Sequence, residues 1–400
     1  MPTFGRQMLE HFLLDPEITY LNHGTVGVPP KRVLDKQQAL RDEMERQPSR
    51  FMLRELHFEQ PAPWRRAPRL REAIGLIAPF FGSRAEDLVF VQNVTTGLNA
   101  VLRSVPLQPG DEIVITDLAY GGVARAAQVW ARERGATLRT IEMPAPVREG
   151  GQIVDAIAKS LTARTRLVMV DHITAQSALV LPVAAIADVC HARGVPVVVD
   201  GAHAPGSIAL DIPATGADWY SGNLHKWAHA PRSCGILWAK PEYQAQLHHP
   251  IASWGSGEGF HAEFEHNATI DPTAFLAAPE GIALLNEWRF DEVLAYMHAL
   301  AVDAGAALAG QWGTTIDAPA SMIGSMVTVP LPEDAGSTTD EAVRLRLALL
   351  VDDRIEVPVH AWRGRLWTRV SAQVYNDRAD IVRLADAVQR QVSRRCSAAL

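Results

Sequence analysis

"RLVMVDHITAQSALVLPVAAIADVCHARGVPVVVDGAH", residues 166–203, contains two short apolar runs separated by a longer stretch with helical spacing. Apolar runs without polar alternation are typical of strands buried on both faces. A helix that joins two such strands makes a right-handed crossover between parallel neighbours. The stretch therefore predicts a β-α-β unit within a parallel sheet.

The same alternation occupies the residues before this stretch. The strand-like runs DLVFV (87–91) and DEIVIT (111–116) are followed by the helical stretches TTGLNAVLRSV (95–105) and GGVARAAQVWARERG (121–135). Repeated units of this kind predict an α/β protein with a doubly wound, mostly parallel sheet.

The pattern changes beyond about residue 260. Two long helical stretches are followed by the strand-like run GSMVTVPLP (324–332), another helix and two further strand-like runs. This order is typical of a smaller α+β domain. We expect a large domain over residues 18–258 and a small domain formed by residues 1–17 and 259–400.

Composition limits the function classes. The chain has 400 residues, a formal net charge of -7 and no long basic run, which disfavours nucleic acid and anionic membranes as partners. The N-terminal MPTFGRQMLEHF does not resemble a signal peptide, and no apolar run approaches the roughly 20 residues needed to span a bilayer. We expect a cytoplasmic protein. The 3 cysteines are far apart and lack CxxC spacing, which disfavours disulfides and structural zinc.

Polar residues follow several of the predicted strands, where open α/β sheets bind their ligands. Thr95 and Thr96 open a helix after residues 87–91, and a helix N-terminus suits a phosphate, although an ordinary helix cap by Thr95 is the alternative. Asp200 ends the most apolar run, and His203 follows it. That carboxylate is either a structural cap or the partner of a ligand cation; a zinc pair with His203 lacks an evident third ligand.

Lys226 lies in NLHKWAHAPRSCG (223–235), where a strand-like DWYS feeds a tight turn. A nucleophilic amine, an anion site and a buried carboxylate are what covalent binding of pyridoxal phosphate requires. The ordered set of Thr95 and Thr96, Asp200, His203 and Lys226 therefore indicates a pyridoxal-phosphate enzyme.

The chain resembles the class V aminotransferase family of fold-type I pyridoxal-phosphate enzymes, and within it the isopenicillin N epimerase-like branch. The resemblance covers nearly the whole chain and rests on an ordered series of segments: YLNHGTVGVPP (20–30), FVQNVTTGLNAVLRS (90–104), PGDEIVITDLAYGGV (109–123), VVVDGAHAPG (197–206), SGNLHKW (221–227), IEVPV (355–359) and RVSAQVYN (369–376). It implies the fold-type I architecture and pyridoxal 5'-phosphate as the cofactor, with no metal.

The resemblance also implies roles for individual residues. Lys226 matches the lysine that forms the Schiff base, Asp200 the partner of the pyridine nitrogen, and His203 the residue that bonds the phenolic oxygen. Tyr120 matches the residue that stacks on the cofactor ring. The phosphate-binding positions are matched by Thr95, Thr96, Ser221 and His225, and the substrate-binding positions by Asn22, His23 and Arg369, of which Arg369 would hold the substrate carboxylate.

The segment SWGSGEG around Trp254 resembles one that reaches a neighbouring subunit's active site. The resemblance therefore implies a homodimer with shared sites and an amino acid as substrate.

The reaction is less constrained than the cofactor. Lys226, once freed by the substrate amine, is the natural base at Cα. We favour an amino-acid epimerase or racemase, because the resemblance is to the epimerase-like branch and the stretch IEVPVHAWRGRLWTR (355–369) lacks the loop cysteine of desulfurases. The alternatives are C–S lysis by β-elimination and transamination. Epimerisation needs a second proton donor, for which His23, Tyr120 and His360 are the candidates.

Overall fold

The computed structural model describes residues 3–57 and 67–398. Within these residues a seven-stranded sheet has the order β2-β8-β7-β6-β5-β3-β4. Neighbouring strands are parallel except at β8, which is antiparallel to both β2 and β7. The strands are β2 (Leu88–Val91), β3 (Glu112–Thr116), β4 (Thr137–Ile141), β5 (Thr165–Asp171), β6 (Val197–Asp200), β7 (Trp219–Asn223) and β8 (Gly235–Ala239). The predicted mostly parallel sheet is confirmed.

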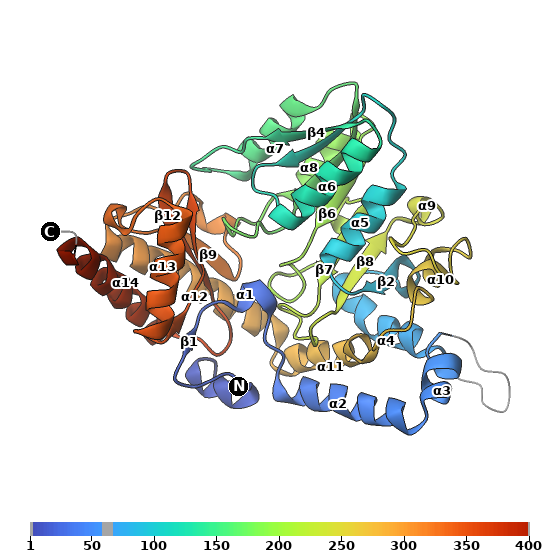
Figure 1. The fold of residues 1–400 in the computed structure, drawn as a ribbon, viewed down its shortest axis with the longest axis horizontal. Helices are drawn as coiled ribbons and strands as arrows, with labels where there is room; N and C mark the ends of the chain where they lie inside the picture. Colours follow the sequence, from blue (N-terminus) through green and yellow to red (C-terminus); the bar gives the residue numbers. More distant parts are fainter. Residues whose placement is uncertain (1–2, 58–66, 399–400) are drawn as a thin grey trace.

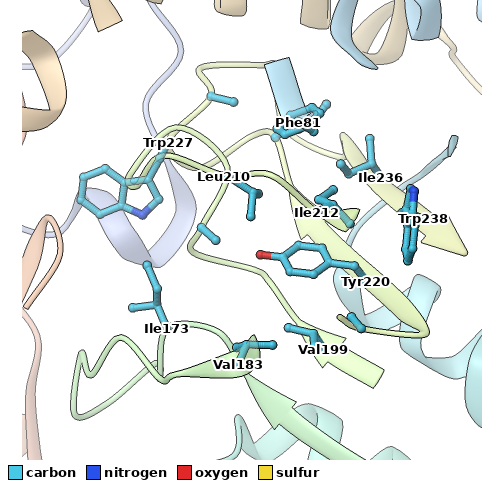
Figure 2. Close-up of a cluster of buried hydrophobic side chains, with 14 of the residues drawn as sticks. Phe81, Ile173, Val183, Val199, Leu210, Ile212, Tyr220, Trp227, Ile236 and Trp238 are labelled. Carbon is cyan, nitrogen blue, oxygen red and sulfur yellow. The ribbon is translucent and has the colours of Figure 1, made fainter. Parts of the chain in front are cut away.

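Helices cover both faces of this sheet, which explains the unbroken apolar runs of its strands. On β6, Val198 packs in the core under α5 (Val94–Ser104) and α6 (Gly121–Glu133). Its neighbours Val197 and Val199 point into the opposite core, with α7 (Gly150–Ser160) and α8 (Val183–His191). Figure 2 shows part of that second core, where Val199, Tyr220 and Ile236 from three strands lie together.

A second, smaller sheet forms the C-terminal part of the fold. Its order is β11-β12-β9, all antiparallel. The elements are α12 (Phe290–Trp312), β9 (Met326–Pro330), α13 (Thr339–Val351), β11 (Val359–Trp362), β12 (Arg365–Ser371) and α14 (Arg378–Ala398). The short strand β1 (Thr19–Tyr20) pairs in parallel with β10 (Ile355–Glu356), so the N-terminal segment crosses to this part. In Figure 1 the short helix α1 (His23–Val26) lies between the two parts.

The remaining helices extend the large domain or connect its elements. α11 (Thr273–Glu287) packs on α2 (Lys31–Arg46) and α4 (Arg69–Ile77) below the sheet in Figure 1. The short helical turns are η1 (Arg6–His11), α3 (Pro48–Arg50), η2 (Phe51–Glu55), η3 (Ala78–Phe81), η4 (Ala85–Asp87), η5 (Pro213–Thr215), α9 (Pro241–Gln244), α10 (Phe260–Glu265), η6 (Ala320–Met322) and η7 (Glu333–Ala335).

The hydrophobic core that contains Val197 and Val199 includes residues on both sides of residue 258, where the sequence analysis divides the chain. Phe275 in α11 and Met297 in α12 belong to the core of the large domain, as does Phe12 near the N-terminus. From Leu300 onwards α12 belongs to the core of the small domain. α12 therefore contributes to both cores, and α11 packs on α2 and α4. The division of the chain at residue 258 stays a prediction.

Helix α12 corrects another expectation. It has 23 residues and a mean hydropathy of 1.4, so by length and composition alone it could cross a membrane. In this fold the apolar residues of α12 pack inside the protein: Leu300, Ala304 and Leu308 are buried in the core of the small domain.

Candidate active site

The carboxyl ends of β2, β3, β5, β6 and β7 meet at one edge of the large sheet, because these strands all run in the same direction. Arg369 on β12 of the small domain and the N-terminal loop around α1 approach the same place. The positive charge of Arg369 contributes to lowering the pKa values of Lys226, His203 and His360. The structure thus brings together residues from both domains that the sequence analysis had selected.

Lys226 lies in the predicted turn between β7 and β8, and its backbone is held from three sides. The ring of His23 contacts the Lys226 carbonyl, with 2.9 Å between Nε2 and the oxygen. Gly27 has φ 67°, and a Cβ there would lie 1.8 Å from the carbonyl oxygen of His225, so only glycine lets the N-terminal loop pass this turn. The following residue, Trp227, is 1% exposed and anchors the turn in the core (Figure 2).

The lowered pKa of the Lys226 amine favours its neutral, nucleophilic form. Burial lowers its pKa to about 8, against the opposing effect of the Asp200 carboxylate. Its Nζ lies 3.2 Å from Nε2 of His203. Burial, followed by the charge of Lys226, holds the pKa of His203 well below its usual value, so this imidazole is neutral and can accept a hydrogen bond from the ammonium group.

We expect the covalent attachment of pyridoxal phosphate to the apoprotein to accelerate as the pH rises through about 8, because only the neutral amine of Lys226 attacks a carbonyl. At pH 7 about one tenth of an amine with this pKa is neutral, compared with less than one thousandth for an ordinary lysine. Stopped-flow absorbance after mixing apoprotein with the cofactor measures this rate. A midpoint above pH 10 would show that the amine is not perturbed.

Two buried carboxyl groups lie at the ends of adjacent strands. Asp200 on β6 is 3% exposed, and its Oδ1 accepts a hydrogen bond from the Ala202 N–H at 2.9 Å. Its partner in the strand register is Asp171 on β5, which is also 3% exposed. Burial raises the pKa of both, and the charge of Asp200 raises that of Asp171 further.

Asp171 was not selected from the sequence, although it ends an apolar strand just as Asp200 does. Its carboxyl group accepts a hydrogen bond from the backbone N–H of Tyr120. Tyr120 precedes α6 and is 52% exposed, so its ring is free to cover a ligand. Asp171 therefore supports the residue that was predicted to stack on the cofactor.

The N-terminus of α5, where the sequence predicts an anion site, is capped differently from the expectation. Asn93, rather than Thr95, caps the helix by accepting a hydrogen bond from the Thr96 N–H at 3.0 Å. The Asn223 side chain accepts from the Val94 N–H at 2.9 Å and joins the end of β7 to this helix. Thr95 is left exposed at the helix start, where a phosphate would bind.

Ser221 does not face this site, contrary to the expected phosphate contact. It is fully buried, and its hydroxyl donates to the Ile236 carbonyl at 2.9 Å. A Cβ on Gly97 would lie 2.3 Å from that hydroxyl, so α5 covers Ser221 completely. Asn223 lies two residues later on the same face of β7, at the end of the strand, where its side chain reaches the first turn of α5. His225 is half-buried beside Lys226, and its Nδ1 donates to the Cys234 carbonyl.

His23 is also placed differently from the prediction. It is fully buried, its Nδ1 lies 2.9 Å from the Tyr375 hydroxyl, and its Nε2 contacts the Lys226 carbonyl. Burial lowers its pKa to about 3. The ring therefore supports the lysine turn and offers no free nitrogen to a substrate or to a proton-transfer step.

Arg369 is buried at the domain interface with its guanidinium facing the site. Nη1 donates to the Ala175 carbonyl, Nη2 donates to Oγ1 of Thr25 at 2.8 Å, and Nε is buried without a partner. Burial lowers its pKa to about 10, and it therefore stays charged at neutral pH. Asn22 lies nearby on the same loop as Thr25, and its amide donates to Glu356 at 2.9 Å. A planar, partly unsatisfied guanidinium of this kind fits a carboxylate.

Arg369→Lys is expected to raise KM for the amino-acid substrate at least tenfold while the affinity for the cofactor changes little, because a point charge replaces a bidentate fork. Steady-state kinetics and cofactor titration measure the two effects separately. An unchanged KM in a folded variant would mean that another residue binds the carboxylate.

The residues at the strand ends fit pyridoxal phosphate. Burial raises the pKa of Asp200 despite the opposing charge of Lys226, and a buried carboxylate of this kind is costly unless a cation joins it, as a protonated pyridine nitrogen would. His203 is 2% exposed and its Nδ1 has no partner among the described residues. The helix start at Thr95 supplies the place for the phosphate. No group of three or more potential metal ligands occurs in residues 3–57 and 67–398.

The segment around Trp254 lies outside this cluster. Trp254 is 94% exposed. The homodimer with shared sites that the sequence implied stays a prediction.

The chain is similar to known proteins in sequence and in fold. A family model described as "Aminotransferase class-V" matches residues 21–384. The chain is 30% identical to "Probable L-cysteine desulfhydrase, chloroplastic" of Arabidopsis thaliana, over 94% of this chain and 83% of that protein. It is 33% identical to isopenicillin N epimerase of Amycolatopsis lactamdurans, over 95% of this chain and 96% of that protein.

Among solved structures, a mutant of C-DES with glycine covalently linked to the pyridoxal-phosphate cofactor has a TM-score of 0.75 and 20% identity. The likeness covers 95% of this chain and 98% of that one. It confirms the predicted fold class.

Proposed function

The chain belongs to the class-V aminotransferase family and uses pyridoxal 5'-phosphate, and from this premise we propose that it is a C–S lyase acting by β-elimination on a cysteine-derived amino acid. When bound, the cofactor supplies an electron sink for the bonds at the substrate's Cα. The 30% identity to a protein named an L-cysteine desulfhydrase supports this reaction class.

Individual residues of this chain have separate roles in such a reaction. Arg369 binds the substrate carboxylate and fixes the orientation of Cα. Lys226, when its amine is free, would remove the Cα proton, and the neutral His203 can accept a hydrogen bond from the resulting ammonium group at 3.2 Å. The electron pair of the Cα–H bond forms a Cα–Cβ double bond, the Cβ–S bond breaks, and the sulfur leaves with its electron pair and a proton. The released 2-aminoacrylate hydrolyses to pyruvate and ammonia.

The observation that supports elimination over epimerisation is that His23 cannot act as a second proton donor at Cα. Inversion needs a proton donor on the opposite face, and His23, the first candidate for it, has both ring nitrogens engaged beneath the lysine turn. Elimination needs no second group at Cα.

A persulfide-forming reaction is not favoured by the described thiols. Cys190 and Cys234 are fully buried. Burial raises the pKa of Cys190 to about 12 and that of Cys234 well above its usual value, so neither supplies a thiolate nucleophile. The side chain of Cys396 lies outside the described residues.

Epimerisation is the second candidate, because the chain is 33% identical to an isopenicillin N epimerase and because Nε2 of His360 is buried without a described partner. Burial and then Arg369 lower the pKa of His360 to about 4, so its imidazole is neutral at physiological pH. Tyr120, the third candidate donor, lies above the same site with its ring exposed.

The test uses holoenzyme in deuterated water with a panel of L-amino acids and cysteine conjugates. Stoichiometric release of pyruvate, ammonia and a thiol, without inverted amino acid, is the expected result. Deuterium at Cα together with both configurations and no pyruvate would replace the lyase by an epimerase. Conversion of an added 2-oxo acid to its amino acid would indicate transamination instead.

A further inference from the structure

One face of the small-domain sheet looks across the domain interface beside Arg369. Opposite residues of antiparallel strands share a face, and the register pairs Arg369 with Thr328 and Trp367 with His360. Trp362, two residues after His360, lies on that face as well. The opposite face, with Val327, Val329 and Val370 among others, is buried in the small-domain core.

The large domain closes over this face through the loop after β5. Arg369 donates to the Ala175 carbonyl, and Oγ1 of Thr328 donates to the Gln176 carbonyl at 2.6 Å. Farther along, Leu179 forms a bridge with Ile323. The two domains therefore meet around Arg369 in a continuous set of contacts.

A cleft lies beside these contacts. Two of its lining residues are neighbours of Arg369 in the small sheet: Thr328 on the paired strand and Trp367 two residues earlier on β12. Its walls include Trp362 and Trp367 from the small domain and Leu118, Val147 and Leu179 from the large domain. The cleft is partly open to solvent, and its free space of about 20 Å³ is roughly enough for one methyl-sized group. Asp317 is the single ionisable residue among those lining it, and its backbone carbonyl accepts a hydrogen bond from the Val147 N–H.

The position of the cleft relates it to the substrate. An amino acid whose carboxylate is held by Arg369 has its side chain within reach of the neighbouring positions on the same face, because alternate residues of a strand are about 7 Å apart. His360 and Trp367 occupy the first of these positions, and Trp362 the next. The lining of the cleft is mainly aromatic and aliphatic, and its polar members are Ser177, Thr328 and Asp317. The unpartnered Nε2 of His360 lies on the same face of the sheet.

We propose that this cleft is the side-chain subsite of the enzyme and that it selects S-alkyl-L-cysteines with a short, uncharged alkyl group over free L-cysteine and over conjugates with an anionic tail. The proposal rests on the lyase function proposed above. A short alkyl group gains apolar contact with the two tryptophans, which the thiol of cysteine is too short to reach. The cations beside the two tryptophans are already engaged, Arg363 by Asp117 and Arg365 by the Leu331 carbonyl. An added carboxylate would therefore lose its water next to Asp317.

The first experiment compares substrates on the unmodified holoenzyme by pyruvate release. S-Ethyl-L-cysteine is expected to have a kcat/KM about tenfold or more above that of L-cysteine. This is the increase in kcat/KM that one added methylene group typically gives in an apolar pocket. S-Carboxymethyl-L-cysteine, of similar length, should fall on the order of a hundredfold below S-ethyl-L-cysteine. Equal values for the three substrates would overturn the subsite while leaving the lyase function intact. Absence of pyruvate from all of them would overturn the lyase function itself.

The second experiment changes the cleft. Ala318 lines the cleft, and Ala318→Phe is expected to reduce kcat/KM for S-ethyl-L-cysteine to near that for L-cysteine, with the value for L-cysteine changed less than twofold. Ala320→Phe is the matched control, because Ala320 is exposed and outside the lining. The opposite change, Trp362→Leu, should raise kcat/KM for S-benzyl-L-cysteine relative to S-ethyl-L-cysteine. If neither variant alters the ratio between substrates, the cleft does not bind the side chain.

Discussion

Lys226→Ala is expected to reduce turnover by roughly four orders of magnitude, the upper range for loss of a positioned general base. The variant loses both the amine that binds the cofactor and the base that removes the Cα proton. Nothing described nearby replaces it, since His203 is neutral with a strongly lowered pKa and His23 is held beneath the turn. The measurement is pyruvate release per enzyme, combined with the absorbance of the bound cofactor.

The chemical readout for Lys226 is independent of activity. Borohydride reduction of the unmodified protein should fix the cofactor on the peptide that contains Lys226, and the variant should carry no such label. A small primary amine added to the variant should restore part of the turnover. Lys36→Ala is the control, because Lys36 is exposed on α2. A label on any other lysine would disprove the assignment.

The second large effect is expected for Asp200→Asn, which should keep the cofactor but lose activity on the order of a hundredfold. A neutral amide cannot hold the ring nitrogen protonated, and the electron sink at Cα is weakened as a result. The amide oxygen can still accept the hydrogen bond from the Ala202 N–H, so the strand end should keep its conformation. Steady-state kinetics and cofactor content measure the two properties.

Asp188→Asn provides the comparison for this variant, since Asp188 is exposed on α8. It should behave as the unmodified protein. Activity of Asp200→Asn within a few fold of normal would remove Asp200 from its role, and the neighbouring carboxyl group of Asp171 would then be the next to test.

The strand and helix pattern of the large domain was readable from the sequence for a physical reason. Strands such as β5 and β6 are buried on both faces. Their successive residues pack alternately against one helix layer and the other, so nearly all of them are apolar. The edge strand β4 was missed, because its residues are half-buried or exposed and carry no such pattern. The sequence also does not show that α10 and α11 pack in the cores on the two faces of the large sheet, since an amphipathic helix does not reveal which core it joins.

The sequence by itself determined the α/β fold, the turn that carries Lys226 and the strand end that carries Asp200, because local apolar patterns and turn residues fix where strands begin and end. Which side chains reach the ligand was decided only by the tertiary structure. The pleat of β7 turns Ser221 under α5, the crossing of the N-terminal loop encloses His23 below Lys226, and the register of β5 against β6 places Asp171 beside Asp200. These outcomes depend on contacts between residues distant in the chain, and no local spacing encodes them.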